Sequence, residues 1–257
     1  MKRRNLILIG VLVFAWTLLM QAPAANLYAW FAPKGDAVQL YGLDGDLGAG
    51  RAQALGVNGR PVLQSLHWQF QPWWLPLLRA AFHVSGGGGD VSVDGRVSLL
   101  FGGVNLGNTK VGGGLKPLLA VAGFPFVPVD GQAQLDLDSL KLRQGFPQSA
   151  SGSMEIHSLS WALGKTPLPL GDFKAVISTD RPTTGTTGVD TIKLVISTLS
   201  GPLDASGEVH LQADRNYDYD LQVKAKSNAD PALHDMLQSL GQPDVSGYYH
   251  MRNRGKL

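Results

Sequence analysis

The chain has 257 residues, of which 44% are hydrophobic and only 16% are charged, with 32 glycines, no cysteine and a formal net charge of +2. This composition argues against a disordered or coiled-coil chain, which would carry more charge, and it excludes disulfides and zinc sites with cysteine ligands. The near-neutral balance gives no electrostatic footprint for nucleic acid, which requires clustered Lys and Arg.

The N-terminal segment has the features of a membrane anchor. Lys2, Arg3 and Arg4 precede a long apolar run. The anchor residues of this run are Leu6, Leu8, Val11, Val13, Phe14, Trp16, Leu18 and Leu19. Because roughly 20 helical residues cross a bilayer, we predict a cytoplasmic basic tail at 1–4, a transmembrane signal-anchor helix at 5–25 and a translocated domain at 26–257.

A cleaved signal peptide is the alternative interpretation of the same segment. Ala22-Pro23-Ala24 has the small-x-small form of a cleavage site after an apolar run. Tyr28 and Trp30, placed where an interfacial aromatic belt would lie, favour the uncleaved anchor. Both interpretations export the remainder of the chain, and cleavage after Ala24 stays open.

Beyond residue 35 the recurrent pattern is a glycine followed by alternating apolar and polar residues, which is typical of an antiparallel sheet with one buried face. Such strands are predicted after Gly95, Gly131, Gly152, Gly207 and Gly247, with each glycine in a tight turn. Further strands are predicted at 64–70, 173–178, 191–197 and 217–225. We therefore expect a mainly β protein, in which an elongated, curved, largely antiparallel sheet carries a few short helices.

The clearest predicted helix covers 231–240. Asp230 is its expected N-cap, Pro231 occupies the first helical position and Gly241 follows its end. Weaker signals predict short helical turns at 73–81 and 115–122 and a flexible loop at Gly86–Gly89.

The sequence contains no catalytic, cofactor or metal motif that we recognise. His-Glu-x-x-His, Gly-x-Ser-x-Gly and the phosphate-binding loop pattern are all missing. His157, His210 and His250 fall on predicted strand faces, and Asp218 and Asp220 share a face that we expect to be solvated. We predict a protein that is not an enzyme and holds no cofactor or metal.

Aromatic residues supply the candidate interaction surface, which consists of Trp73, Trp74, Tyr248 and Tyr249. The tryptophans lie near Trp68 in sequence, so the cluster is compatible with a core, a membrane-surface contact or a binding patch. The C-terminal strand from Gly247 to Met251 is a candidate sheet edge, where a partner could add a strand.

Several segments together resemble protein N of the bacterial type II (general) secretion system. The most specific runs from Leu199 to Leu211, followed by Leu233 to Gly247, and Leu170-Gly-Asp-Phe173, 131–138 and Phe146-Pro147 also match the pattern of this family. The motif residues are Gly201, Pro202, Leu203, Gly207, Leu240, Gly241, Pro243 and Gly247. One departure is Gly48, where family members often carry an aromatic residue.

The resemblance implies a non-enzymatic accessory component of the type II secretion apparatus. Its expected location is the bacterial inner membrane, crossed once, with the N-terminus cytoplasmic and the C-terminal domain periplasmic. There it would take part in export of folded proteins across the outer membrane by contacting other secretion subunits, namely the inner-membrane platform and the secretin. The expected lipid contact is through the N-terminal helix, and no nucleic acid or small-molecule substrate is expected.

Two other functions stay open at this stage. The family is also similar to AsmA-type proteins, whose curved sheets present an apolar groove, so the main alternative is a periplasmic lipid-binding or lipid-transfer module. A third interpretation is a periplasmic enzyme or carbohydrate binder that uses the cluster from Trp68 to Trp74.

Overall fold

The computed structural model describes residues 17, 21–31, 38–57, 59–72, 80–100, 103–121, 123–162, 166–180 and 190–256. The chain divides into two compact units, Met1–Asp94 (unit one) and Gly95–Leu257 (unit two), and the division falls within strand β8 (Val91–Leu100). Within the described residues, thirteen strands are hydrogen-bonded in the order β16-β15-β14-β13-β12-β11-β10-β9-β8-β7-β6-β3-β2, and a separate small sheet has the order β1-β4-β5. The expected mainly β, antiparallel fold with few short helices is confirmed.

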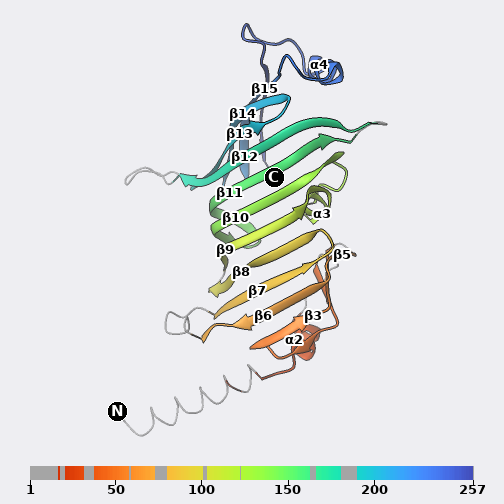
Figure 1. Ribbon diagram of the computed structural model, residues 1–257. Coiled ribbons are helices and arrows are strands. Elements are labelled where there is room, and N and C mark those ends of the chain that lie inside the picture. The colour runs from red at the N-terminus through yellow and green to blue at the C-terminus, as the bar shows by residue number, and fades with distance from the viewer. Residues whose placement is uncertain are drawn as a thin grey trace, which may run out of the picture. The chain divides into compact units, whose positions relative to one another are not determined.

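Unit one consists of short elements (Figure 1). They are α2 (Ala24–Phe31), β1 (Val38–Tyr41), β2 (Asp44–Gly45), β3 (Ala49–Ala52), β4 (Ala54–Val57), β5 (Arg60–Leu63), β6 (Ser65–Phe70) and β7 (Ala80–Gly88). The Trp68 indole donates to the Asp46 carbonyl at 3.1 Å, and the Gly48 carbonyl accepts from the Phe70 amide. Trp68 therefore helps to hold the first strands of this unit together.

Unit two contains long strands (Figure 1). Its elements after β8 are β9 (Gly103–Gly114), α3 (Leu115–Val121), β10 (Val129–Arg143), β11 (Phe146–Trp161), β12 (Leu168–Asp180), β13 (Thr191–Ser200), β14 (Leu203–Gln212), β15 (Asn216–Ala225), α4 (Pro231–Gln238) and β16 (Tyr249–Lys256). Each strand from β9 to β16 pairs antiparallel with the next, so the chain runs up and down the sheet.

The strand register sorts side chains onto two faces, because residues directly opposite each other in an antiparallel sheet share a face. One row across the sheet is Val111, Leu135, Met154, Ala175, Ile196, Gly207, Leu221 and Met251, and this face is called the apolar face. The neighbouring row on the other side is Lys110, Asp136, Ser153, Val176, Val195, Glu208, Asp220 and Arg252, and this is the polar face. The alternation seen in the sequence thus produces a one-sided sheet.

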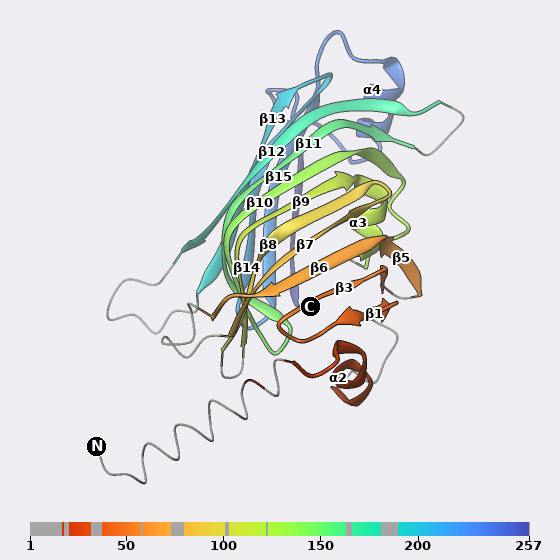
Figure 2. The same cartoon turned by 60° about the horizontal axis from the view of Figure 1, so that its bottom comes forward.

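Both helices of unit two lie at the same end of the strands (Figure 2). Helix α3 follows the end of β9 and α4 follows the end of β15, and these two strands run in the same direction. This end of the unit-two sheet, with α3, α4 and the chain from Leu240 to Tyr248, is called the helix end.

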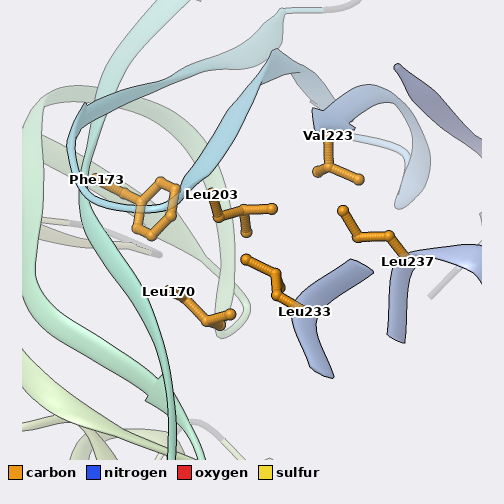
Figure 3. Packing of buried hydrophobic residues seen from close by; sticks show 6 residues of the cluster. All are labelled: Leu170, Phe173, Leu203, Val223, Leu233 and Leu237. Atoms are coloured by element: carbon orange, nitrogen blue, oxygen red, sulfur yellow. The ribbon is translucent and has the colours of Figure 1, made fainter. Parts of the chain in front are cut away.

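The helices cover the apolar face at the helix end with two clusters that share Leu159 and Trp161 of β11. The α3 cluster consists of Leu115, Val129 and Ala133. The α4 cluster consists of Leu170, Phe173, Leu203, Val223, Leu233 and Leu237 (Figure 3). Leu233 is completely buried and Leu237 is 2% exposed, so α4 supplies the most deeply buried side chains of this core.

Helix α4 forms where capping and periodicity predict it. The Asp230 carboxylate accepts from the Ala232 amide at 2.8 Å, and Pro231 opens the first turn, which satisfies one otherwise unpaired amide of the helix start. Leu233 and Leu237 are one turn apart, so both project from the same side of the helix. The predicted helix is confirmed, with its observed end at Gln238.

Most of the glycines predicted to occupy tight turns lie instead inside long strands. Gly95, Gly131, Gly152 and Gly207 belong to β8, β10, β11 and β14. Gly152 and Gly207 both have φ of 153°, and a Cβ atom there would lie 2.2 Å from the Asp136 and the Asp220 carbonyl oxygen, respectively. The turn prediction was wrong for these four residues, because Gly131, Gly152 and Gly207 leave room for the neighbouring backbone and Gly95 leaves room for the Thr109 side chain. Only Gly247 lies in a turn.

One short prediction fails in unit one, and most of another lies outside the described residues. The loop predicted at Gly86–Gly89 is largely strand, because β7 continues to Gly88 and the Ser65 carbonyl of β6 passes 2.7 Å from the place of a Gly86 Cβ atom. Of the helical turn predicted at 73–81, Ala80 and Ala81 form the start of β7, where pairing with β6 imposes extended backbone. The helix predicted at 115–122 is confirmed as α3.

Most of the predicted membrane anchor lies outside the described residues, including all of its anchor residues and Lys2, Arg3 and Arg4. Among the helices that are described, none has the length and hydropathy to span a membrane. Helix α2 begins at Ala24, and the Tyr28 hydroxyl accepts from the Leu40 amide at 3.1 Å.

Candidate functional site at the helix end

Segments that are far apart in the sequence meet at the helix end. Strands β11 and β13 finish there, and β12, β14 and β16 begin there. The up-and-down order therefore brings together most of the segments that carry the resemblance. These are 170–173, 199–203, 233–247 and the first residues of 131–138. Phe146 and Pro147 lie at the opposite end of the strands, at the start of β11.

Gly171 and Gly201 form the closest backbone approach at this end. A Cβ atom on Gly201 would lie 2.3 Å from the Gly171 Cα, and one on Gly171 would lie 2.2 Å from the Ser200 carbonyl oxygen. Both residues have positive φ, 122° and 113°, which L-residues with side chains rarely adopt. The two glycines of the family pattern therefore let β12 and the β13–β14 turn touch directly.

Asp172 ties three strands together beside these glycines. Its carboxylate accepts from the Ser158 amide of β11 at 2.7 Å and from the Ser200 hydroxyl of β13 at 2.7 Å. These hydrogen bonds lower the pKa of Asp172 below its usual value, and the bond from Ser200 has the larger effect. The Leu170-Gly-Asp-Phe173 segment thus has a structural explanation for its glycine, aspartate and phenylalanine.

The turn before β16 is organised around Asp244. Its Oδ1 accepts from the amides of Ser246 at 2.8 Å and Tyr248 at 2.9 Å, and its Oδ2 accepts from His250 Nε2 at 2.9 Å. The backbone closes the same turn, because the Asp244 amide donates to the Tyr248 carbonyl at 2.8 Å. We call the segment Asp244–Tyr248 the Asp244 turn.

The hydrogen bonds to Asp244 favour its ionised form. The bond from His250 has the largest effect, followed by that from the Tyr248 amide, and together they lower the pKa of Asp244 to about 2. The carboxylate is therefore ionised throughout the physiological range, and the turn keeps its three acceptor contacts.

Lys224 and Asp204 fasten the Asp244 turn to the sheet. Lys224 Nζ donates to the Ser246 carbonyl at 2.7 Å and lies 5.2 Å from the centre of the Tyr248 ring. The Tyr248 hydroxyl donates to Asp204 Oδ2 at 2.8 Å, and this bond is the main cause of the raised pKa of Tyr248. The turn is thus bonded to both β14 and β15.

The predicted interaction residues have different places in the structure. Tyr248 is half-buried and held by Asp204, whereas Tyr249 packs against the α4 cluster. Trp73 and Trp74 lie outside the described residues. The structure brings Tyr248 and Tyr249 to the helix end, where most of the residues of the family pattern also lie.

Exposed apolar side chains occur in several of the segments that meet at the helix end. Val245 is fully exposed at the tip of the Asp244 turn, and Phe126, in the connection from α3 to β10, is 92% exposed. The other exposed apolar side chains here are Val121, Phe124, Val127, Leu199 and Leu240. Surface apolar residues that gather in one region mark interaction sites more often than scattered ones do.

The polar face carries ion pairs typical of a solvated sheet surface. Lys174 Nζ lies 2.8 Å from Glu155, Lys193 Nζ 2.8 Å from Glu208, and His210 Nδ1 3.1 Å from Asp218. His157, His210 and His250 are on strands, as predicted. Across the described part of the chain, no group of three or more acidic or histidine side chains could hold a metal ion.

Sequence analysis missed the role of Asp244 and its partners. The signal was present, because Pro243-Asp244-Val-Ser-Gly247 has the residues of an Asx-type turn. No sequence pattern connects Asp244 with Asp204 and Lys224, however, since these contacts depend on which strands become neighbours.

The fold and this site define a one-sided antiparallel β-sheet protein with a rigid, partly apolar surface at one end of its strands. The chain belongs to the family of type II secretion system (T2SS) protein N, whose family model matches residues 36–252. The resemblance stated from the sequence is thereby confirmed. Curated proteins and solved structures, compared separately, gave no match.

Family membership makes the chain a component of type II secretion and suggests the bacterial cell envelope as its location. Its family consists of structural secretion components that are not known as enzymes. The matched residues include nearly all of unit two, with the helix end and the Asp244 turn.

Proposed function

We propose that this protein is a non-enzymatic, accessory inner-membrane component of the type II secretion apparatus, which uses the helix end as a docking surface for other secretion subunits in the periplasm. The observation that carries the proposal is the coincidence of two features at one place. Most of the segments that carry the family pattern meet at the helix end, and exposed apolar side chains project from the same end.

The rigidity of the surface supports a docking role. The Asp244 turn is fixed by hydrogen bonds to His250, Lys224 and Asp204, so the exposed Val245 side chain is presented with little conformational freedom. A preorganised surface loses less conformational entropy on binding than a flexible one. Partners on this view are the inner-membrane platform and the outer-membrane secretin, and the anchor is the segment 5–25.

The test uses charge introduced at the exposed tips. Val245→Asp and Phe126→Asp should leave folding intact, because both side chains are exposed, and should weaken subunit binding at least about tenfold, or ~1.4 kcal/mol. The matched control is Val176→Asp, which places the same charge on the polar face at a residue that is 48% exposed. Secretion of folded substrate is measured in secreting cells, together with site-specific photocrosslinking from position 240, which is also exposed at the helix end.

Loss of secretion and of subunit crosslinks in the two tip variants, with the control unaffected, supports docking at the helix end. Normal secretion in Val245→Asp and Phe126→Asp cells, at unchanged protein levels, contradicts it. If the crosslinked species is a lipid and no secretion subunit is recovered, the docking proposal also fails.

A lipid-binding module is the second candidate, and one observation favours it. Away from the helix end the apolar face continues over the middle of the strands, where Met154, Ile177, Leu194, Val209 and Leu221 are only half-buried among the described residues. An apolar sheet face of this kind is compatible with a bound acyl chain.

The lipid candidate is tested by a pair of neighbouring residues on β13. Leu194→Gln changes the apolar face, whereas Val195→Gln is the matched control on the polar face. If the face holds lipid, native mass spectrometry of the full-length protein extracted from its membrane should show stoichiometric lipid that Leu194→Gln removes and Val195→Gln retains. Lipid-free protein, or equal loss in both variants, contradicts this candidate.

A further inference from the structure

Strand β16 forms one edge of the sheet in unit two. It pairs with β15 from Tyr249 to Lys256 and is the last strand in the hydrogen-bonded order. Among the described residues nothing pairs with its outer side, so alternate backbone N–H and C=O groups along about eight residues face outward. The sheet edge predicted at Gly247–Met251 corresponds to β16, which begins two residues later, at Tyr249, and continues to Lys256.

The two faces of this edge strand have contrasting chemistry. His250, Arg252, Arg254 and Lys256 lie on the polar face, opposite Gln222, Asp220, Asp218 and Asn216 of β15. Tyr249 and Met251 lie on the apolar face, where both pack against the α4 cluster. Asn253 and Gly255 continue this face toward the end of the strand. A strand added to β16 would therefore meet a row of basic side chains on one face, and on the other face two apolar side chains followed by Asn253 and Gly255.

The basic row is only partly neutralised. Arg252 Nε lies 2.8 Å from Asp220 Oδ2, with 68% of the arginine side chain exposed. Asp218, which is opposite Arg254, is 3.1 Å from His210 Nδ1. Within residues 190–256, which the structure describes without a gap, Arg254 and Lys256 form no ion pair.

Strand β15 shows which sequence suits this edge strand. It carries Asp218 and Asp220 on the face of the arginines and Tyr219, Leu221 and Val223 on the apolar face. Because the side chains of β16 project above and below the sheet, a strand paired with its free edge would contact the same side chains as β15 does. We infer that the free edge of β16 binds an extended segment of a partner protein in which acidic and apolar residues alternate, as they do in β15.

A second copy of this chain does not fit the same edge. Pairing β16 with β16 antiparallel would place two rows of Arg and Lys beside each other on one face, and like charges on neighbouring strands are destabilising. Basic side chains on an edge also discourage pairing with purely apolar strands. The edge is therefore selective for a strand that brings negative charge.

The experiment measures binding of a labelled peptide to the purified full-length protein by fluorescence anisotropy. The probe has the sequence of β15, NYDYDLQVKA. One control peptide has both aspartates replaced by lysine, and another has the same composition in an order without alternation. The inference predicts binding of the probe alone, weakened by salt because exposed charges are screened. Equal binding of the reordered peptide means that the contact is only electrostatic, and overturns the inference.

Protein variants locate the site. Arg254→Glu with Lys256→Glu should weaken probe binding about tenfold or more, because two attractive cross-strand contacts become repulsive. The matched control is Lys141→Glu with Arg143→Glu, which reverses two exposed basic residues at the same spacing on β10, a strand paired on both sides. Equal weakening in both double variants contradicts binding at the edge.

A pair of prolines tests whether backbone pairing is involved. Neighbouring residues of an edge strand direct their N–H groups to opposite sides. One of the two variants Asn253→Pro and Arg254→Pro therefore removes an N–H donor that faces outward, and the other removes a hydrogen bond between β15 and β16. The variant that keeps the melting temperature should lose probe binding. Retained binding in that variant overturns strand addition.

This inference rests on the proposed function only in that the partner is a protein. The peptide assay needs no secretion apparatus, so its failure leaves docking at the helix end untouched. Conversely, the Val245→Asp and Phe126→Asp variants leave β16 unchanged. Normal secretion in these variants would contradict docking at the helix end without contradicting strand addition at β16.

Discussion

The apolar face of unit two has a covered part and an open part that are built from the same strands. At the helix end, α4 buries Leu233 completely and Leu237 to 2% exposure against β12, β14 and β15. Further along these strands Leu194, Val209 and Leu221 continue the face, yet they remain half-buried among the described residues. The same alternation of apolar and polar residues thus gives a closed core where a helix covers the apolar face, and a partly exposed surface elsewhere.

The covered part should depend most on Leu233. Leu233→Ala deletes a fully buried side chain and should lower the free energy of unfolding by about 2–5 kcal/mol, from lost burial and the remaining cavity. Urea unfolding of the full-length protein measures the change. Leu240→Ala, at a residue that is 46% exposed, is the control and should cost much less. Similar costs in both variants would show that α4 is not held as described.

The open part should be less sensitive to the same kind of truncation. Leu194→Ala removes a half-buried side chain and should cost about 1 kcal/mol, while the neighbouring Val195→Ala on the polar face should change stability by about 0.5 kcal/mol or less. The same urea titration is used. A cost for Leu194→Ala as large as that for Leu233→Ala would mean that another molecule or segment covers this part of the face.

The smallest expected effect is the acid sensitivity of the Asp244 turn. The folded-state pKa of Asp244 is about 2, below the unfolded value of ~3.9. The stabilisation is therefore complete above the unfolded pKa and is lost as the pH falls through the folded pKa. Melting temperatures from pH 6 to pH 2 should decline more steeply for the wild type than for Asp244→Asn. Parallel curves would contradict the assignment.

Much of the fold could be predicted from local pattern. Alternation placed the strands of unit two, and the Asp230 cap with Pro231 placed α4, because these signals act within a few residues. The glycines misled the prediction since a glycine in a turn and a glycine beside a neighbouring backbone look identical in sequence. Gly152 and Gly207 are inside strands, so the strands are longer than the pattern indicated.

The candidate site was harder to predict because it depends on strand order. The family pattern singled out Gly201, Gly241 and Gly247, but it did not predict that they would lie at the same end of the folded sheet. The contacts of Asp244 with β14 and β15 through Tyr248 and Lys224 form only once the up-and-down order is complete. The role of Trp73 and Trp74 as part of an interaction surface stays a prediction, because both residues lie outside the described residues.

The length of the central hairpin has a mechanical consequence. Strands β10 and β11 have 15 and 16 residues, so each rises roughly 50 Å, at about 3.3 Å per residue. Bonded to each other along this length, and to β9 and β12 on either side, they form a stiff spacer. A load applied at the helix end is transmitted along covalent backbone to the far turn between Arg143 and Phe146.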